Sequence, residues 1–141
     1  MLSASNSILA LDVGGKRIGV ALANAVARIA SPLTTLENNA TIVQDIETLI
    51  KQYDVAVLVC GLPRGLDGQR TAQTETVENF VKELQKTIDI PLYWQDEAVT
   101  SRQAEAELQS RAKGYRKEDI DALAATYILE DFLNEHPEIQ A

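Results

Sequence analysis

The fold is decided by residues 8–23, which read ILALDVGGKRIGVALA. The first six residues form an apolar run with one acid inside it, Asp12, and this pattern predicts a buried strand. Two glycines follow and signal a turn, after which residues 18–23 predict a second strand beside the first. A third strand is predicted over residues 32–36. Its first residue is Pro32, and proline is tolerated at a strand start. Three strands with such short links predict an antiparallel meander.

Beyond this meander, helical and strand-like patterns alternate. Helices are predicted over residues 42–50, 71–88, 101–111 and 117–134, and strands over 55–60 and 90–94. The order is therefore βββαβαβαα. It predicts an α/β fold with a five-stranded mixed sheet, in which the last two strands lie parallel to the first. Because there are no repeats or linkers, residues 1–141 are expected to form a single domain with an ordered core over 7–135.

Composition and charge limit the class of protein. The net charge of -8 argues against a protein that coats nucleic acid non-specifically. A single cysteine rules out a disulfide within the chain and suits a reducing compartment. The first apolar run is too short for a signal sequence or a membrane span. We therefore expect a soluble, cytoplasmic protein that does not bind membranes.

Basic side chains gather in three short stretches, each in or beside a predicted loop. These stretches are Lys16 with Arg17, Arg64 with Arg70, and Arg111, Lys113, Arg116 and Lys117. From charge alone, solubilising loop residues are the commoner explanation. The alternative is a local surface that holds phosphates on an otherwise acidic protein.

Asp12 is the most informative single residue. A carboxylate in an apolar central strand is costly unless it is paired or binds a metal. Asp12 also suits a simpler role, capping the turn that follows the strand. The two glycines and the basic pair directly after it favour close approach of a ligand.

Two further acidic positions lie where they can join Asp12. Asp96 and Glu97 follow the fifth strand, and ligands bind outside the carboxyl ends of parallel strands. Successive strand residues face opposite ways, so one of the two is expected to face the site, and the sequence alone does not choose between them. The pair equally suits the start of the next helix. Asp121 lies in the first turns of the last helix among small residues that allow close packing, although a solvent-facing acid is common there.

Three carboxylates from separate elements suit Mg²⁺ or Mn²⁺, which prefer oxygen ligands. Such a metal removes the repulsion between close carboxylates, polarises a phosphodiester and activates water. With one histidine and one cysteine, a structural zinc site is disfavoured. A Ser-His-Asp hydrolase is also disfavoured, because His136 lies in the tail.

Four ordered motifs resemble the YqgF-like family, whose members are described as pre-16S ribosomal RNA nucleases or Holliday-junction resolvases. The motifs are residues 11–21, 61–68, 96–101 and 116–125. The likeness spans about residues 8–134. It implies a ribonuclease-H-like fold, with Asp12, Glu97 and Asp121 as catalytic acids and metal ligands, and it favours Glu97 over Asp96.

The resemblance also suggests how the chain holds its substrate. It implies phosphate contacts at Lys16, Arg17 and Arg64, and the basic loop with Arg116 and Lys117 is expected to hold nucleic-acid backbone. Three positions depart from the family pattern. The family usually has an aromatic where Val13 stands, often Thr where Gly15 stands, and usually Arg where Ala98 stands. Loss of that Arg is expected to weaken activity or shift substrate choice.

The leading hypothesis is a metal-dependent endonuclease that, by resemblance, processes the 5′ end of precursor 16S rRNA, with nucleic acid and ribosomal particles as partners. The first alternative is a Holliday-junction resolvase, which needs two active sites and hence a dimer. A non-catalytic RNA- or ribosome-binding module is the next alternative. A sugar-kinase-type ATP-binding domain ranks last, because the chain lacks the second lobe. The sequence leaves open RNA or DNA, one or two metals, and monomer or homodimer.

Overall fold

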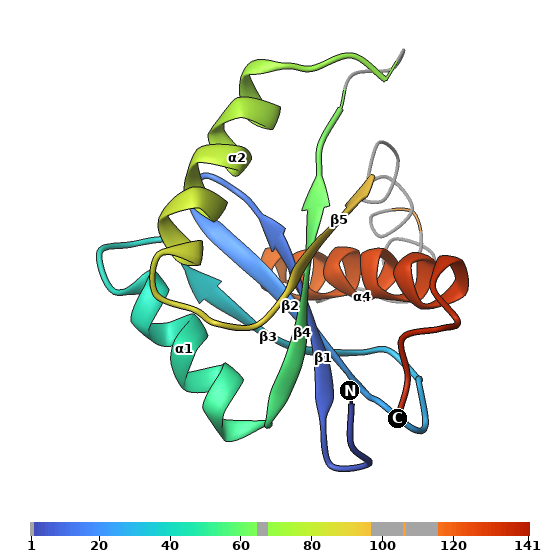
Figure 1. Cartoon of the computed structure of the whole chain (residues 1–141). Coiled ribbons are helices and arrows are strands. Elements are labelled where there is room, and N and C mark those ends of the chain that lie inside the picture. Colours follow the sequence, from blue (N-terminus) through green and yellow to red (C-terminus); the bar gives the residue numbers. More distant parts are fainter. Residues whose placement is uncertain (1, 65–67, 97–105, 107–115) are drawn as a thin grey trace.

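Five strands form one mixed sheet that is covered by helices on both faces (Figure 1). The structure is a computed structural model that describes residues 2–64, 68–96, 106 and 116–141. The strands are β1 (Ser7–Val13), β2 (Arg17–Asn24), β3 (Ser31–Glu37), β4 (Val55–Leu62) and β5 (Leu92–Asp96). The described helices are α1 (Ile42–Gln52), α2 (Ala72–Gln85) and α4 (Lys117–Glu135).

The sheet has the strand order β3-β2-β1-β4-β5. β1, β2 and β3 pair antiparallel, which confirms the predicted meander. β4 pairs parallel with β1, and β5 pairs parallel with β4. The predicted α/β class and five-stranded mixed sheet are therefore confirmed. β1 lies at the centre, so its carboxyl end has strands on both sides.

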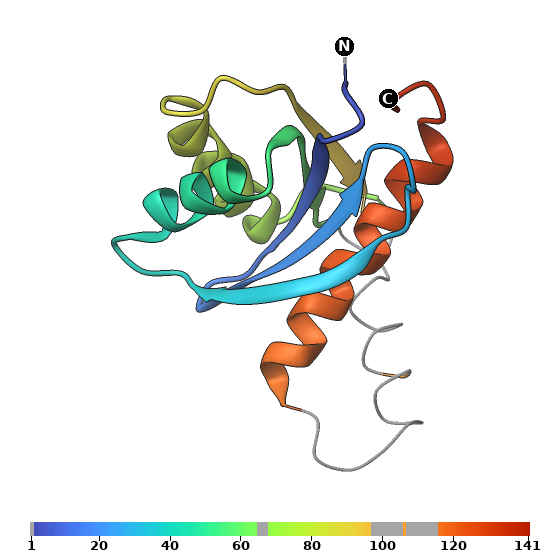
Figure 2. The same ribbon diagram turned by 90° about the horizontal axis from the view of Figure 1, so that it is seen from below.

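The two faces of the sheet carry separate apolar cores, because side chains alternate along each strand. α1 and α2 cover one face, and α4 crosses the other (Figure 2). The core under α1 and α2 is built on Leu9, Leu11, Val13, Ile18, Val20, Leu58 and Cys60 of the sheet. The core under α4 joins Ile8, Ala10, Ala21, Ala23, Val57 and Val59 of the sheet to Ala125, Ile128, Leu129, Phe132 and Leu133 of the helix.

The main differences from the predicted elements lie at β5 and α2. β5 was predicted over 90–94 but occupies 92–96, because pairing with β4 begins only at Leu92 opposite Leu58. Ile90 packs against the core without joining the strand. The predicted start of β5 was therefore too early, because an apolar residue before the strand was counted as part of it. α2 ends at Gln85, although Ile88 still packs against the core. The helix predicted over 101–111 lies outside the described residues, apart from residue 106.

Residues after α4 are held against the turn between β2 and β3. The Arg28 guanidinium donates hydrogen bonds to the carbonyl oxygens of Leu133, His136 and Ile139. The Ala141 amide donates to the carbonyl of Ala25 over 3.2 Å. These bonds fix the carboxyl end of α4 on the sheet. Among the described helices, none is long and apolar enough to cross a membrane.

Candidate active site

Asp12 lies on the face of the sheet that α4 crosses. Ile8 and Ala10 stand at every second position before it along β1, and both belong to the core under α4. Asp12 follows them on the same face and is half-buried. Its partner on the neighbouring strand β2 is Gly19.

The backbone of α4 packs directly against the sheet at Gly19. A Cβ added at Gly19 would overlap the carbonyl oxygen of Asp121 and lie 3.0 Å from the amide nitrogen of Ala122. The α4 backbone therefore rests directly on the glycine, and a larger residue there would force the helix to shift. Because Gly19 pairs with Asp12, this contact brings the backbone of Asp121 beside the strand position that carries Asp12. The two acids lie far apart in the sequence, but their backbone positions are neighbours in the fold.

Arg17 joins this pair of acids. It lies on β2, two residues before Gly19, so its side chain also points to the α4 face. Its Nε donates a hydrogen bond of 2.6 Å to Oδ2 of Asp121. The side chains of Arg17 and Asp121 are 32% and 26% exposed, so both stay within reach of solvent. The hydrogen bond to Asp121 and its charge raise the pKa of Arg17 above its ordinary value, and Glu118 adds a smaller charge effect.

The turn that carries Lys16 and Arg17 is held by its own backbone and by Asn38. The Gly14 amide donates to the Arg17 carbonyl over 2.9 Å. The side-chain amide of Asn38 donates to the Gly14 carbonyl over 2.8 Å, and its backbone amide donates to the Lys16 carbonyl over 2.9 Å. These bonds fix the backbone from which the two basic side chains extend.

A pocket of 570 Å³ opens beside the turn. Lys16 and Arg17 line it from the turn, Thr35 and Asn38 from the β3 side, and Glu118 from the first turn of α4. The Thr35 hydroxyl donates to the Glu118 carbonyl over 2.7 Å and so ties the start of α4 to β3. Its lining also includes the apolar Leu36 and the acid Glu37, and it shares Arg17 with the Arg17–Asp121 pair, so it offers room for a ligand beside Arg17.

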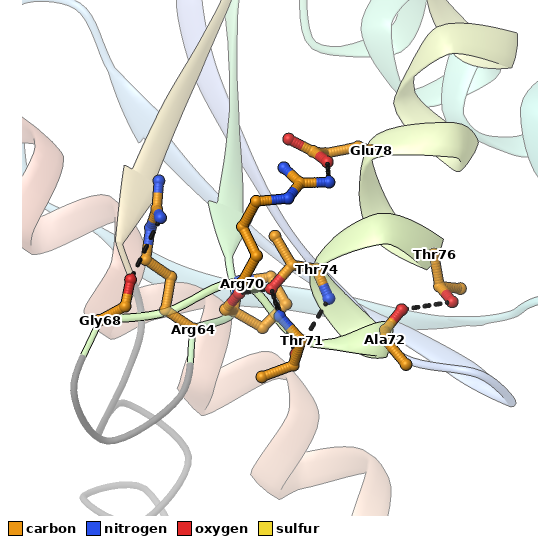
Figure 3. Close-up of polar contacts among 9 residues, drawn as sticks. Arg64, Gly68, Arg70, Thr71, Ala72, Thr74, Thr76 and Glu78 are labelled. Atoms are coloured by element: carbon orange, nitrogen blue, oxygen red, sulfur yellow. Dashed lines mark hydrogen bonds and ion pairs between the residues drawn. The ribbon is translucent and has the colours of Figure 1, made fainter.

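Arg64 lies at the carboxyl edge of the parallel strands, in the loop between β4 and α2 (Figure 3). Its Nε donates to Oδ1 of Asp96 over 3.1 Å, and its Nη1 donates to the Gly68 carbonyl over 3.3 Å. The Thr74 hydroxyl at the start of α2 donates to the Pro63 carbonyl over 2.5 Å. The described parts of this loop are thus tied to both β5 and α2.

The side chains of β5 bear on the choice between Asp96 and Glu97. Gln95 is buried and donates from Nε2 to Oε2 of Glu135, over 2.5 Å, so it faces α4. Asp96 is the next strand residue, so it points to the opposite face, where it meets Arg64. Asp96 therefore does not face the same side as Asp12. Glu97 lies outside the described residues.

The remaining predicted residues lie at the amino end of α4. The Arg116 side chain is exposed, and its backbone amide donates to Oδ2 of Asp119 over 3.0 Å. Lys117 is the first residue of the helix. The structure thus gathers Asp12, Arg17 and Asp121 at one place and holds Arg64 with Asp96. Among the described residues, no three His, Cys, Asp or Glu side chains come together.

A family model described as "RuvX: Holliday junction resolvase" matches residues 6–135. The chain belongs to the RuvX family. The predicted resemblance to YqgF-like proteins is thereby confirmed, because RuvX and YqgF denote the same family.

Curated relatives cover nearly the same length as this RuvX chain. A protein of Crocosphaera subtropica named "Putative pre-16S rRNA nuclease" is 42% identical over 133 residues, which are 92% of this chain and 93% of the relative. A protein of the same name from Roseiflexus is 42% identical over 139 residues, which are 95% of this chain and 98% of the relative.

Solved structures confirm the ribonuclease-H-like fold. Thermus thermophilus RuvC in complex with a Holliday junction substrate has a TM-score of 0.58 at 11% identity, covering 95% of this chain and 98% of that one. The fowlpox virus Holliday junction resolvase has a TM-score of 0.56 at 10% identity, covering 92% and 98%. At such identities the likeness concerns the fold alone.

Two features of the site in this RuvX chain did not follow from the sequence analysis. The first is the role of Gly19; a glycine inside a strand pattern is a known signal for close backbone approach. The second is the bond between Arg17 and Asp121. No local pattern signals that bond, because it depends on the register of α4 over β2.

Proposed function

We propose that this chain is a metal-dependent nuclease that hydrolyses phosphodiester bonds at the 5′ end of precursor 16S rRNA. The contact of α4 with Gly19 carries the proposal, because it brings the backbone of Asp121 beside the position of Asp12. Membership of the RuvX family and relatives named for a pre-16S rRNA nuclease support the reaction class and the substrate.

The donor set fits Mg²⁺ or Mn²⁺. Asp12 and Asp121 supply carboxylate oxygens from a strand and a helix, and these hard cations prefer oxygen ligands. We assign Glu97 as the third acid, because Asp96 is turned away toward Arg64. When bound, the metal would supply Lewis-acid polarisation of the phosphodiester and activation of water.

The basic side chains of the chain bind and orient the substrate in this proposal. Lys16 and Arg17 extend from a turn that Asn38 holds in place. Arg116 and Lys117 lie at the amino end of α4, and Arg64 lies at the edge of the parallel strands. Together they provide local positive charge on a chain whose net charge is -8.

A second candidate function is resolution of four-way DNA junctions. The description of the RuvX family favours it, and the fold matches resolvases. Two symmetric cuts need two active sites, so this function requires a dimer. The substrate in the relatives' name is the reason we place precursor rRNA first, with ribosomal particles and the cytoplasm as the corresponding partner and location.

The test compares two labelled substrates with the purified protein and Mg²⁺. One is a 5′ fragment of precursor 16S rRNA, and the other is a four-way DNA junction. We expect cleavage of the RNA and its loss in Asp12→Asn. Asp131→Asn is the matched control, because it removes an acid from the other end of α4.

Each outcome decides between the functions. Cleavage of the RNA alone supports the proposal, and paired symmetric nicks in the junction support the resolvase. RNA binding without cleavage, unaffected by Mg²⁺ or by Glu97→Gln, overturns the enzyme in favour of a binding module. Activity that persists in Asp12→Asn overturns the assigned site.

A further inference from the structure

The Arg17 side chain forms an ion pair with Asp121, an acid that the proposed function assigns to the metal. Its Nε lies 2.6 Å from Oδ2 of Asp121. The backbone on both sides of this bond is held, since the Gly14 amide bonds the Arg17 carbonyl and the Asp121 carbonyl rests on Gly19. The two side chains are the movable parts, and both are partly exposed.

A divalent cation and a guanidinium compete for this carboxylate. An arginine side chain stays charged at all physiological pH values. A metal that binds Asp121 therefore meets a like charge within a few ångströms, and the repulsion weakens with the distance between them. The energy of the system falls if Arg17 leaves Oδ2 when a metal arrives.

When nucleic acid is bound, a backbone phosphate offers Arg17 a second partner besides Asp121. The guanidinium fork matches the geometry of two phosphate oxygens, which a lysine does not reproduce. Arg17 and Lys16 both line the 570 Å³ pocket next to the Asp121 pair. A backbone phosphate at the mouth of this pocket would meet both basic side chains, with the acids Glu37 and Glu118 also in the lining.

We propose that Arg17 couples metal binding to nucleic-acid binding by exchanging Asp121 for a substrate phosphate. A metal frees Arg17 for the phosphate, and a phosphate draws Arg17 away from the metal ligand. Each ligand then strengthens the other by the same factor, as linkage requires. The inference rests on the proposed metal site and adds a positioning role for Arg17.

A second arginine provides the matched control. Arg70, which lies just before α2, forms an ion pair with Glu78 of that helix that has the same length, 2.6 Å (Figure 3). Helix α2 covers the other face of the sheet. Arg70→Gln removes one guanidinium and leaves one unpaired carboxylate, as Arg17→Gln does. A difference between the two variants therefore reports the position of Arg17 and not the loss of a charge in general.

The experiment measures Mn²⁺ affinity by electron paramagnetic resonance. The wild-type protein, Arg17→Gln, Arg17→Lys and Arg70→Gln are titrated with and without a short phosphorothioate RNA, whose sulfur substitution slows hydrolysis. Circular dichroism confirms that each variant is folded. The readouts are the Mn²⁺ affinity of the protein alone and the factor by which RNA raises it.

Without RNA, we expect Arg17→Gln to bind Mn²⁺ about threefold more tightly than the wild type, because the competing charge is gone. We expect RNA to raise the wild-type Mn²⁺ affinity by about fivefold and to have little effect in Arg17→Gln. Arg17→Lys keeps the charge and loses the fork, so it should match the wild type without RNA and show weaker coupling. Arg70→Gln should match the wild type in both readouts.

Weaker Mn²⁺ binding by Arg17→Gln overturns the inference, because Arg17 would then orient Asp121 for the metal. Unchanged coupling in Arg17→Gln overturns it as well. Absence of Mn²⁺ binding to the wild-type protein overturns the proposed metal site and this inference with it. Mn²⁺ binding without coupling leaves the proposed function standing and overturns the inference alone.

Discussion

The two faces of the sheet are packed in different ways. Under α1 and α2 the core is made of apolar side chains from the strands and from both of these helices. Under α4 it is apolar toward the carboxyl end of the helix, where Ile128, Leu129 and Phe132 are fully buried. Toward its amino end the same helix meets the sheet through backbone at Gly19 and presents Asp121, which accepts a hydrogen bond from Arg17 of β2.

This difference shows how one helix combines anchoring with a polar site. The apolar half of α4 fixes its position, and the bonds from Arg28 to its carboxyl end add to that anchoring. The amino half is then free to approach the sheet without large side chains between them. The close approach brings Asp121 to the sheet position of Asp12, and the face with side-chain packing throughout has no counterpart of this arrangement among the described residues.

The first prediction tests whether the apolar half of α4 anchors as firmly as the other face. Phe132→Ala should lower the free energy of unfolding by about 3–5 kcal/mol, because a fully buried ring is lost and a cavity remains. Leu84→Ala on α2 should cost about 2–5 kcal/mol for the same reason. Urea unfolding measures both. A cost for Phe132→Ala well below that for Leu84→Ala would show that α4 is only loosely attached.

The second prediction concerns the backbone contact itself. Gly19→Ala should lower the free energy of unfolding by about 2–3 kcal/mol, because the added methyl overlaps the Asp121 carbonyl and the helix must shift. Gly15→Ala is the control, since nothing lies within 4 Å of a Cβ there. It should change stability by less than about 0.5 kcal/mol. Equal stabilities for the two variants in urea would mean that α4 does not rest on Gly19.

The third prediction is the smallest and concerns pH. Burial raises the pKa of Asp131, and the charge of Glu135 adds to the shift. An acid with a raised pKa in the folded state costs stability as the pH rises from its unfolded to its folded pKa. Asp131→Asn should therefore be more stable than the wild type at neutral pH by a few tenths of a kcal/mol, since solvent screens the site.

Thermal unfolding at two pH values measures this difference. The advantage of Asp131→Asn should disappear at about pH 3, where the carboxyl is protonated in both the folded and the unfolded state. An advantage that persists unchanged at low pH would assign it to something other than the charge.

Much of this architecture follows from local patterns in the sequence. The apolar run around Asp12 and the glycine turn predict β1 and β2, and alternation along β1 fixes the face on which Asp12 lies. The small residues around Asp121 predict close packing of α4. The boundary of β5 did not follow, because Ile90 is apolar but lies before the pairing with β4 begins.

The pairings between distant side chains did not follow from the sequence either. The bonds of Arg17 to Asp121 and of Arg64 to Asp96 depend on how helix and loop lie over the sheet. From the sequence, both arginines are expected to contact phosphate, and their pairing with acids of the same chain is not predicted. The sequence alone does not choose between Asp96 and Glu97 as the acid that faces the site. In the structure Gln95 faces α4 and Asp96 faces the other side of the sheet, which disfavours Asp96.

The central claim is that Asp12 and Asp121 act as one catalytic unit, and a double-mutant comparison tests it most directly. The cleavage rate of the precursor 16S rRNA fragment is measured for Asp12→Asn, Asp121→Asn and the double variant. Each single variant should lose about 10³-fold or more, and the double variant should lose no more than either, because residues that act as a unit are not additive. Full activity in Asp121→Asn, or losses that multiply in the double variant, would contradict the account.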